Sequence, residues 1–563
     1  VIHHLQNDPV AEAVSHSKAI AVSPQSPVVD HLIGERLSRK YRFREGAAYQ
    51  QLALRAAPDF LPAKTQLAQD LLRLGNDERG WKLADEAQNQ DKYDTTLFNL
   101  MQLKNDLNKF ATRTTDHFVI RMNASESAVY GDRVEALLAS AMDTLSQKYG
   151  YTPTEKVVVE IFDRPSDFAV RTFGLPDVAG FLGVCFGKVI TANSPASQRE
   201  NPTNWESVLW HEFCHVITLQ MTDNRIPRWL SEGISVYEER QRDQRCGQHM
   251  SPVFRARVQD GNITPVSQLS SAFLNAKSGE DLNFAYYESS MVVEFLVQEY
   301  GFESLVAILN DLKSGLTIND ALARHTGGLA ELDASFERYL KSVADDFAKD
   351  VRFDIQTENG AAPNLAALAQ EDSSHYTAGL QQAANFVRAG EVDQAIEKLE
   401  QLIELFPEDP SPNGARPLLA QIYERQNKTD LLVQVLTEHL QRSDDDLESA
   451  MKLLKLHVEA EAWQAALAAG QLVTAIDPLQ PTALRNIYIA AVEAQDNSSA
   501  LRALNGLLEL EPADAARTHF QIASMLADED RSQARRHVLL ALEQAPRYRD
   551  AHKLLLELTA QSD

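Results

Sequence analysis

Apolar positions in the last third of the chain recur at a fixed interval. Pro478, Pro512 and Pro546 are 34 residues apart, and each follows an amphipathic run. A small residue stands twelve positions before each of these prolines, namely Ala466, Ala500 and Ala534. A small side chain allows two helices to cross closely, and proline ends the second helix because it has no N–H. The pattern predicts stacked helical hairpins.

The same offset relates Ala395 to Pro407, with Gly390 where a turn between helices would fall. About five hairpins therefore fit within residues 376–563. A lone hairpin cannot bury its own apolar face, so the hairpins are expected to form a solenoid with a concave groove. We expect this groove to hold a peptide or protein partner, and the alternative is a purely structural scaffold.

The N-terminal segment shows a weaker form of the pattern. Ala57-Pro58-Asp59 follows one apolar helix, and a second helix ends before Gly75. About two repeat units of the same kind are expected within residues 1–112.

Between Thr115 and Phe353 the pattern changes to β-branched and apolar runs typical of strands. Strands are predicted at 117–122, 157–162 and 187–193, and a helix at 131–148. This order, followed by long helices, indicates an α+β domain. The expected segments are helical repeats at 1–112, the α+β domain at 113–353, a linker at 354–375 and a repeat solenoid at 376–563.

Composition narrows the possible functions. Hydrophobic residues make up 44% of the 563 residues, and no run of about 18 apolar residues predicts a membrane-spanning helix. The net charge of −26 argues against nucleic-acid binding, which needs clustered Lys and Arg. Solubility of a large helical surface explains this charge better than attraction of basic substrates. Three irregularly spaced cysteines, Cys185, Cys214 and Cys246, predict neither a disulfide framework nor a cysteine-based metal site.

The segment from Trp205 to Met221 carries the clearest chemistry. Its apolar spacing predicts a helix, with Thr203 and Glu206 as a capping box at the start. On a helix, His211 and His215 share one face, which is the placement that one metal ion requires of two imidazole ligands. Glu212, one step round the helix, is placed to reach a water on that metal.

A second helix is predicted from Pro227, and it carries Glu232 seventeen positions after His215. Two antiparallel helices joined by a short loop can bring this carboxylate to the open side of the histidine pair. Two imidazoles, one carboxylate and one water form a tetrahedral catalytic zinc site.

His211-Glu-Phe-Cys-His215 followed by Trp229-Leu-Ser-Glu-Gly-Ile-Ser-Val-Tyr237 resembles the gluzincin, or thermolysin-like, superfamily, in particular the peptidase MA-like domains fused to tetratricopeptide repeats. The Trp-Leu-x-Glu-Gly run is also similar to M1 aminopeptidases. The resemblance implies a thermolysin-like α+β domain at 113–353 that binds one Zn2+ through His211, His215 and Glu232. It also implies that Glu212 is the general base.

A tyrosine is also implied by this resemblance. The run Ala285-Tyr-Tyr-Glu288 is similar to the gluzincin helix that supplies a phenol to the transition state. Tyr287 matches best, and Tyr286 is the alternative. Packing in a buried helix face would explain either residue equally well without the zinc motifs upstream.

The predicted activity is hydrolysis of peptide bonds in a peptide or protein that the repeats recruit. M1 aminopeptidases carry an acidic residue before the zinc helix, and Gly183-Val-Cys-Phe-Gly187 has none, so an endopeptidase is the preferred reading. A non-enzymatic adaptor and a protease–chaperone for misfolded proteins are the alternatives. A periplasmic or secreted location is weakly favoured for a protease that begins at Val1, because a leader would have been removed.

Overall fold

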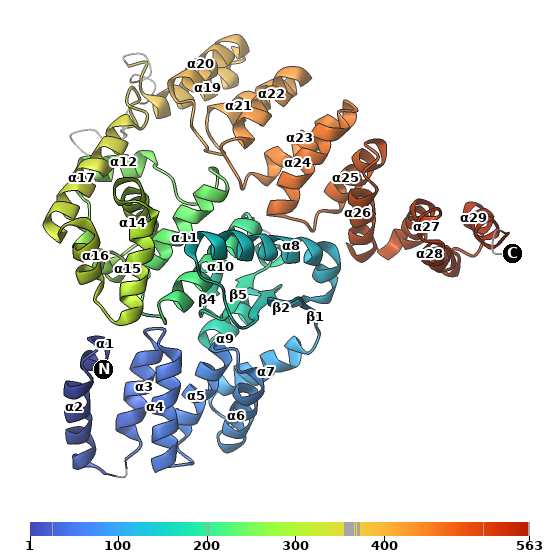
Figure 1. Cartoon of the computed structure of the whole chain (residues 1–563). Helices are drawn as coiled ribbons and strands as arrows, with labels where there is room; N and C mark the ends of the chain where they lie inside the picture. The colour runs from blue at the N-terminus through green and yellow to red at the C-terminus, as the bar shows by residue number, and fades with distance from the viewer. Residues whose placement is uncertain are drawn as a thin grey trace. The chain divides into compact units, whose positions relative to one another are not determined.

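The computed structural model describes residues 1–24, 26–198, 200, 202–353, 365, 368, 372–510 and 512–560. Most of these residues are helical, with one small sheet (Figure 1). They form two compact units: Val1–Asn123 with Glu135–Ser197 and Ser207–Phe347, and Ala124–Val134 with Gln198–Glu206 and Ala348–Asp563. Most of the expected linker at 354–375 lies outside the described residues. No described helix is long and apolar enough to cross a membrane.

The first unit begins with helices, of which α3 and α4 pack together and α5 and α6 pack together. These helices are α1 (Ile2–Leu5), α2 (Pro9–Val22), α3 (Val28–Ser38), α4 (Phe43–Ala56), α5 (Leu61–Arg73), α6 (Asp77–Gln90) and α7 (Thr95–Leu107). Small residues permit the α3–α4 contact, because a side chain on Gly34 would collide with Gln50 and with the carbonyl of Gly46.

The sheet of the first unit has the strand order β1-β2-β3-β5-β4. Its strands are β1 (Phe110–Thr114), β2 (Phe118–Asn123), β3 (Val157–Phe162), β4 (Gly183–Cys185) and β5 (Val189–Asn193). The central pairs β2–β3 and β3–β5 are parallel, whereas β1 and β4 pair antiparallel at the two edges. The three predicted strands correspond to β2, β3 and β5, and the short edge strands were missed.

The N-terminal helices and the sheet share one hydrophobic core. Leu72 and Leu100 pack in the same buried cluster as Val158, Phe162 and Phe186 of the sheet region. A buried ion pair lies at this junction, since Arg171 contacts the Glu160 carboxylate of β3 at 2.6 Å and also donates to the carbonyl of Leu72 in α5 at 3.2 Å. The expected separation at residue 112 is therefore not a boundary between two cores, and it falls inside β1.

The remaining helices up to residue 346 follow the sheet or connect its strands. They are α8 (Ala124–Tyr149), α9 (Pro165–Phe173), α10 (Trp205–Met221), α11 (Arg228–Arg242), α12 (Pro252–Gln259), α13 (Ser270–Asn275), α14 (Gly279–Tyr300), α15 (Phe302–Ser314), α16 (Ile318–Thr326) and α17 (Leu329–Asp346). Within them, α11 packs along α14. A side chain on Gly233 would lie 2.5 Å from the carbonyl oxygen of Ser289, so the glycine after Glu232 is what lets these two helices meet.

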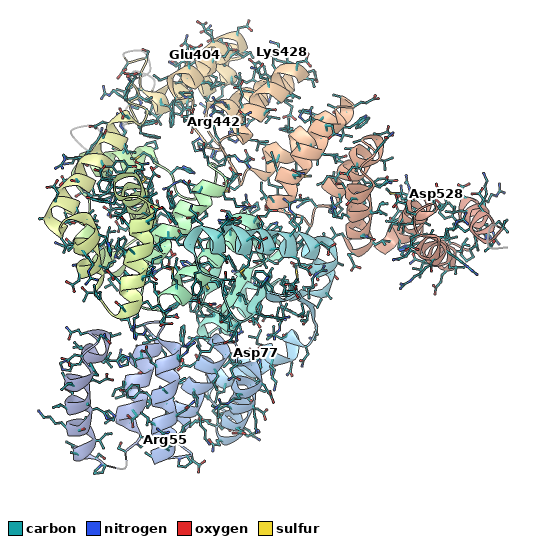
Figure 2. All side chains as sticks on the ribbon, in the orientation of Figure 1. Arg55, Asp77, Glu404, Lys428, Arg442 and Asp528 are labelled. Atoms are coloured by element: carbon teal, nitrogen blue, oxygen red, sulfur yellow. The ribbon has the colours of Figure 1, made fainter. Side chains whose placement is uncertain are left out.

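The second unit consists mainly of consecutive helical hairpins (Figures 1 and 2). Its helices are α19 (Tyr376–Ala389), α20 (Val392–Leu405), α21 (Ala415–Arg425), α22 (Thr429–Leu440), α23 (Leu447–Glu459), α24 (Trp463–Ile476), α25 (Pro481–Glu493), α26 (Asn497–Leu510), α27 (Ala515–Leu526), α28 (Arg531–Gln544) and α29 (Arg549–Ala560). The alanines of the repeat pattern, Ala395, Ala466, Ala500 and Ala534, are fully buried. The pattern thus marks the close crossings within hairpins.

The shared core predicts that a change in the N-terminal helices destabilises the whole first unit. Leu100→Ala should lower its free energy of unfolding by about 2–5 kcal/mol, because the cavity opens between α7 and the sheet. Urea unfolding followed by tryptophan fluorescence measures this free energy, since Trp210 is in α10 and Trp229 is in α11. Tyr93→Ala, at a side chain that is 95% exposed in the same segment, should change little. An unchanged transition in Leu100→Ala would contradict the shared core.

A buried carboxyl in α14 predicts a pH dependence of stability. Glu288 is fully buried, and it accepts the backbone N–H of Thr264 at 2.6 Å. Burial raises the pKa of Glu288 to about 7. A folded-state pKa above the unfolded one means that stability is lost as pH rises through this value. Glu288→Gln should therefore remove part of the stability loss of the wild type between pH 4.5 and about pH 7, the ordinary and the raised pKa of this carboxyl, in thermal melts, and the exposed Glu280→Gln should not.

Candidate metal centre

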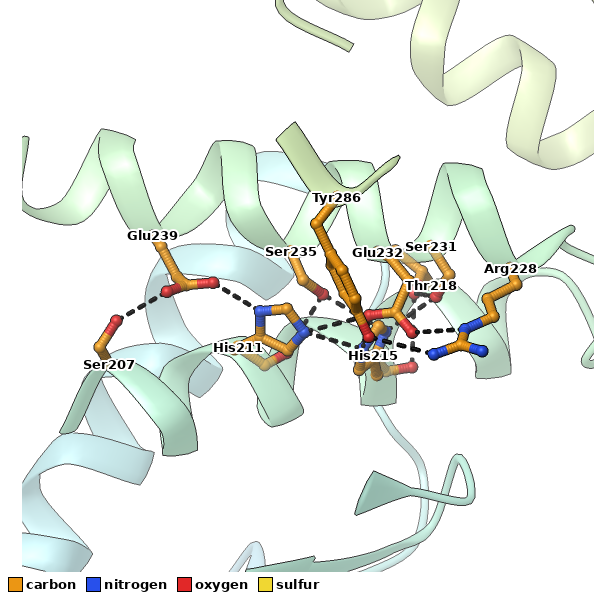
Figure 3. Close-up of polar contacts among 10 residues, drawn as sticks. All are labelled: Ser207, His211, His215, Thr218, Arg228, Ser231, Glu232, Ser235, Glu239 and Tyr286. Carbon is orange, nitrogen blue, oxygen red and sulfur yellow. Dashed lines mark hydrogen bonds and ion pairs between the residues drawn. The ribbon is translucent and has the colours of Figure 1, made fainter. Parts of the chain in front are cut away.

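The site forms where α10 and α11 run antiparallel (Figure 3). The Ser207 hydroxyl donates to the Glu239 carboxylate at 2.8 Å, and the Thr218 and Ser231 hydroxyls lie 3.2 Å apart. These contacts pair the start of one helix with the end of the other. The polar side chains of both helices therefore face one another.

Local sequence explains how the two helices begin. The Asn204 side chain accepts the backbone N–H of Glu206 at 3.1 Å, whereas the Thr203 hydroxyl contacts Gln198. The first turn of α10 is thus capped by Asn204, which corrects the expected capping box at Thr203. In the connecting loop, Asp223 and Asn224 have φ angles of 49° and 58°, a conformation that short polar residues tolerate.

Three atoms that can bind a metal converge between the helices. His211 Nε2 lies 3.1 Å from His215 Nε2 and 3.3 Å from Glu232 Oε2, and the third separation, His215 Nε2 to Glu232 Oε2, is 3.2 Å. Ligands at about 2.0–2.1 Å from one tetrahedral ion lie roughly 3.3 Å from each other. The spacing of these three atoms therefore fits one ion.

Hydrogen bonds hold the other nitrogen of each imidazole. His211 Nδ1 lies 2.5 Å from Glu239 Oε1, and His215 Nδ1 lies 2.8 Å from Ser231 Oγ. An ionised carboxylate can only accept, so the His211 proton is on Nδ1 and a neutral ring leaves Nε2 as a lone-pair donor. These contacts orient both rings so that their Nε2 atoms and Glu232 Oε2 meet at one point, the placement that a single metal ion requires.

The electrostatics of the cluster agree with this requirement. Burial lowers the pKa of His211, but the negative charge of Glu239 and bonds to both carboxylates outweigh it, so the pKa lies well above the ordinary value. Burial raises the pKa of Glu232, but His215 and His211 outweigh this effect and hold it well below its usual range. The site attracts a positive charge, which a metal ion or a proton can supply.

Glu212 lies beside this cluster in a buried position. Among the described residues, its Oε2 atom has no hydrogen-bond partner. Burial raises the pKa of Glu212 to about 7, although His215 and His211 act in the opposite direction. A side chain on Gly183 would lie 2.7 Å from Glu212 Oε1, so the glycine brings edge strand β4 directly against this carboxylate.

The structure distinguishes the two tyrosines of α14. The Tyr286 hydroxyl accepts from Arg228 Nη2 at 3.2 Å, and Arg228 Nε also donates to Glu232 Oε1 at 3.2 Å (Figure 3). Tyr287 is 2% exposed and stacks on Phe254, with ring centroids 5.2 Å apart. The preference for Tyr287 is therefore corrected, because the rotation of α14 turns Tyr286 toward the cluster and Tyr287 into the core.

Sequence reasoning missed Glu239 and Arg228. Glu239 lies seven residues after Glu232, about two helical turns along, so it shares a face with that residue. Arg228 lies one turn before Glu232. Helical spacing from a proposed ligand is a signal that could have found both. Cys214 is buried in the helix packing, as expected.

Comparisons with solved structures find only distant likeness. YrrB, described as a TPR protein with an unusual peptide-binding site, is 15% identical, covers 36% of this chain and all of its own, and has a TM-score of 0.26. A MamA fragment from Desulfovibrio magneticus RS-1 is 15% identical over 33% of this chain and 99% of its own, with a TM-score of 0.23. At these TM-scores neither protein informs the fold, and the repeats are described from their own hairpins.

No curated protein matches the chain. The model of the Peptidase MA superfamily matches residues 139–342, a range that contains both metal helices and α14. The chain therefore carries a Peptidase MA superfamily domain at residues 139–342.

Proposed function

We propose that this domain is a zinc-dependent endopeptidase. The observation that carries the proposal is the triangle of His211 Nε2, His215 Nε2 and Glu232 Oε2, 3.1–3.3 Å on each side. Beside it is the buried Glu212, whose Oε2 has no hydrogen-bond partner among the residues that the structure describes. Two imidazoles and one carboxylate at these distances suit a four-coordinate zinc ion. Because Arg228 holds Glu232 Oε1, one oxygen of that carboxylate is left for the metal and a coordination position stays open.

Each residue has a task in peptide hydrolysis. When bound, zinc supplies Lewis-acid activation of a water and of the scissile carbonyl. Glu212 takes the proton of the attacking water and passes it to the leaving amine, and its raised pKa of about 7 suits both steps. Glu239 fixes the tautomer and orientation of the His211 ring.

Tyr286 is proposed as the donor to the developing oxyanion. Arg228 donates to the phenolic oxygen, so the hydroxyl proton of Tyr286 is free to point elsewhere. Strand β4, at the sheet edge and against Glu212, offers unpaired main-chain groups to an extended substrate. The helical hairpins are proposed to bind a peptide or protein partner, which includes the substrate.

The deciding experiment uses the zinc-loaded full chain and its Glu212→Gln variant on an unbiased peptide mixture read by mass spectrometry. We expect internal cleavage by the wild type and a rate at least about 10²-fold lower in the variant, because the base is lost while the ligands remain. Equal zinc content in both proteins is the control. Full zinc content without any cleavage would contradict the peptidase and favour an adaptor whose repeats bind partners.

The two tyrosines form a matched pair for a second test. Tyr286→Phe should lower kcat by about 10²–10³-fold with zinc content unchanged, because only the oxyanion donor is removed. Tyr287→Phe, the same change at the neighbouring buried ring, should leave kcat within a few-fold of the wild type. A larger loss of kcat in Tyr287→Phe than in Tyr286→Phe would contradict the assignment.

A further inference from the structure

A hollow of about 270 Å³ lies where four segments that are distant in sequence meet in the first unit. Its walls come from α1 and the turn after it, the turn between α3 and α4, the loop between α10 and α11, and the segment where α15 is followed by α16. A side chain on Gly315 would lie 2.3 Å from Asn7 Nδ2, so the glycine lets the N-terminal turn close over the end of α15. The hollow is separate from the metal centre, because the described residues that line it do not include His211, His215 or Glu232.

The ionisable side chains that line this hollow are all basic. They are His4, Lys40, Arg42 and Arg225, and no Asp or Glu of the described residues joins them, although the whole chain has a net charge of −26. Within the described part of the chain, the side chains of Lys40 and Arg225 form no ion pair with a carboxylate. Arg225 instead donates to the carbonyl of Lys313, which is a neutral group. Two positive charges therefore border the hollow without a negative charge to balance them.

The other two basic residues are held by a carboxylate that lies outside the lining. Arg42 donates to Glu45 through Nε and Nη2, and His4 Nε2 lies 3.4 Å from Glu45 Oε1. No contact of Arg42 Nη1 is found among the described residues, so this group is an available donor. Asn224 supplies a neutral donor, because its Nδ2 atom is buried and has no hydrogen-bond partner in the part of the chain that the structure describes. A ligand with acceptor oxygens would satisfy these donors.

The rest of the lining is mainly apolar, and its apolar members are Leu5, Ile226, Pro227, Leu312, Leu316 and Ile318. Cationic N–H groups bind carboxylates through short, charge-assisted hydrogen bonds. Pockets for drug-sized ligands measure roughly 300–1,000 Å³, so a hollow of about 270 Å³ suits a smaller ligand. Charge, lining and volume together favour a small anion that carries an apolar group.

We infer that this hollow is a binding site for a small organic carboxylate, whose anionic group is held by Lys40 and Arg225 and whose apolar group packs against Ile226 and Ile318. Two sources have this chemistry: a free aliphatic acid, and the C-terminal residue of a peptide when its side chain is apolar. The inference goes beyond the proposed function and does not depend on it, because the binding site is separate from the metal centre.

Calorimetry on the full chain tests the inference with N-acetylleucine, its uncharged amide, isocaproate and acetate. We expect saturable binding of N-acetylleucine or isocaproate, and binding at least about tenfold weaker for the amide, which lacks the charge. Acetate should also bind more weakly, because it has no apolar group. The ranking of the two larger acids identifies the source, since a peptide end is represented by N-acetylleucine and a free aliphatic acid by isocaproate.

Charge-removing variants assign the binding to this hollow. Lys40→Gln and Arg225→Gln should each raise the Kd of the tighter acid roughly three- to tenfold. Lys40 is exposed and without an ion pair among the described residues, so its replacement leaves the fold intact even if Arg225→Gln disturbs the loop. Lys82→Gln, at an exposed lysine of α6 outside the hollow, is the matched control and should not change the Kd.

Four results would overturn the inference. They are the absence of saturable binding by both larger acids, equally tight binding of the amide, an unchanged Kd in Lys40→Gln, and an equal rise of the Kd in Lys82→Gln. Peptide cleavage by the chain enters none of these measurements, so the carboxylate site and the proposed peptidase stand or fall separately.

Discussion

The antiparallel pairing of α10 and α11 is the constraint on which the site depends. It brings His211, His215 and Glu232 within 3.3 Å of one another, the spacing of three ligands around one metal ion. The same pairing supplies the groups that hold the rings, because Glu239 and Ser231 also come from α11. The candidate metal ligands and the side chains that orient them thus lie on two helices joined by a short loop.

The elements that pack against α10 and α11, namely β4 and α14, determine which side chains lie around the candidate metal centre. Edge strand β4 comes against Glu212 because residue 183 is a glycine, and α14 comes against α11 because residue 233 is a glycine. The contact between β4 and Glu212 determines the side on which, in the proposed function, an extended peptide pairs with the sheet. The contact between α14 and α11 places Tyr286 against Arg228, next to Glu232. The absence of side chains at residues 183 and 233 therefore allows Glu212 and Tyr286, the proposed base and the proposed phenol donor, to lie around the same cluster.

The N-terminal helices form one core with the sheet that includes β4. Their apolar faces complete the core of the sheet, and buried charges such as Arg171 and Glu160 bind the junction. In the second unit, by contrast, each hairpin packs mainly on its sequence neighbours, with alanines at the crossings. The N-terminal hairpins thus form part of the unit that contains the candidate metal centre, whereas the C-terminal hairpins form a repeat array.

The sequence by itself determined the features that depend on short-range spacing. The positions of His211 and His215 on one helical face follow from helix geometry, and the buried alanines of the repeats follow from their period. Only the tertiary structure decided which tyrosine of α14 faces the cluster, since a rotation by one residue exchanges Tyr286 for Tyr287 and that rotation is set by packing on Gly233. Only the tertiary structure joined the N-terminal helices to the core of the sheet, because that packing links residues far apart in the chain, and local pattern carries no information on how distant segments pack.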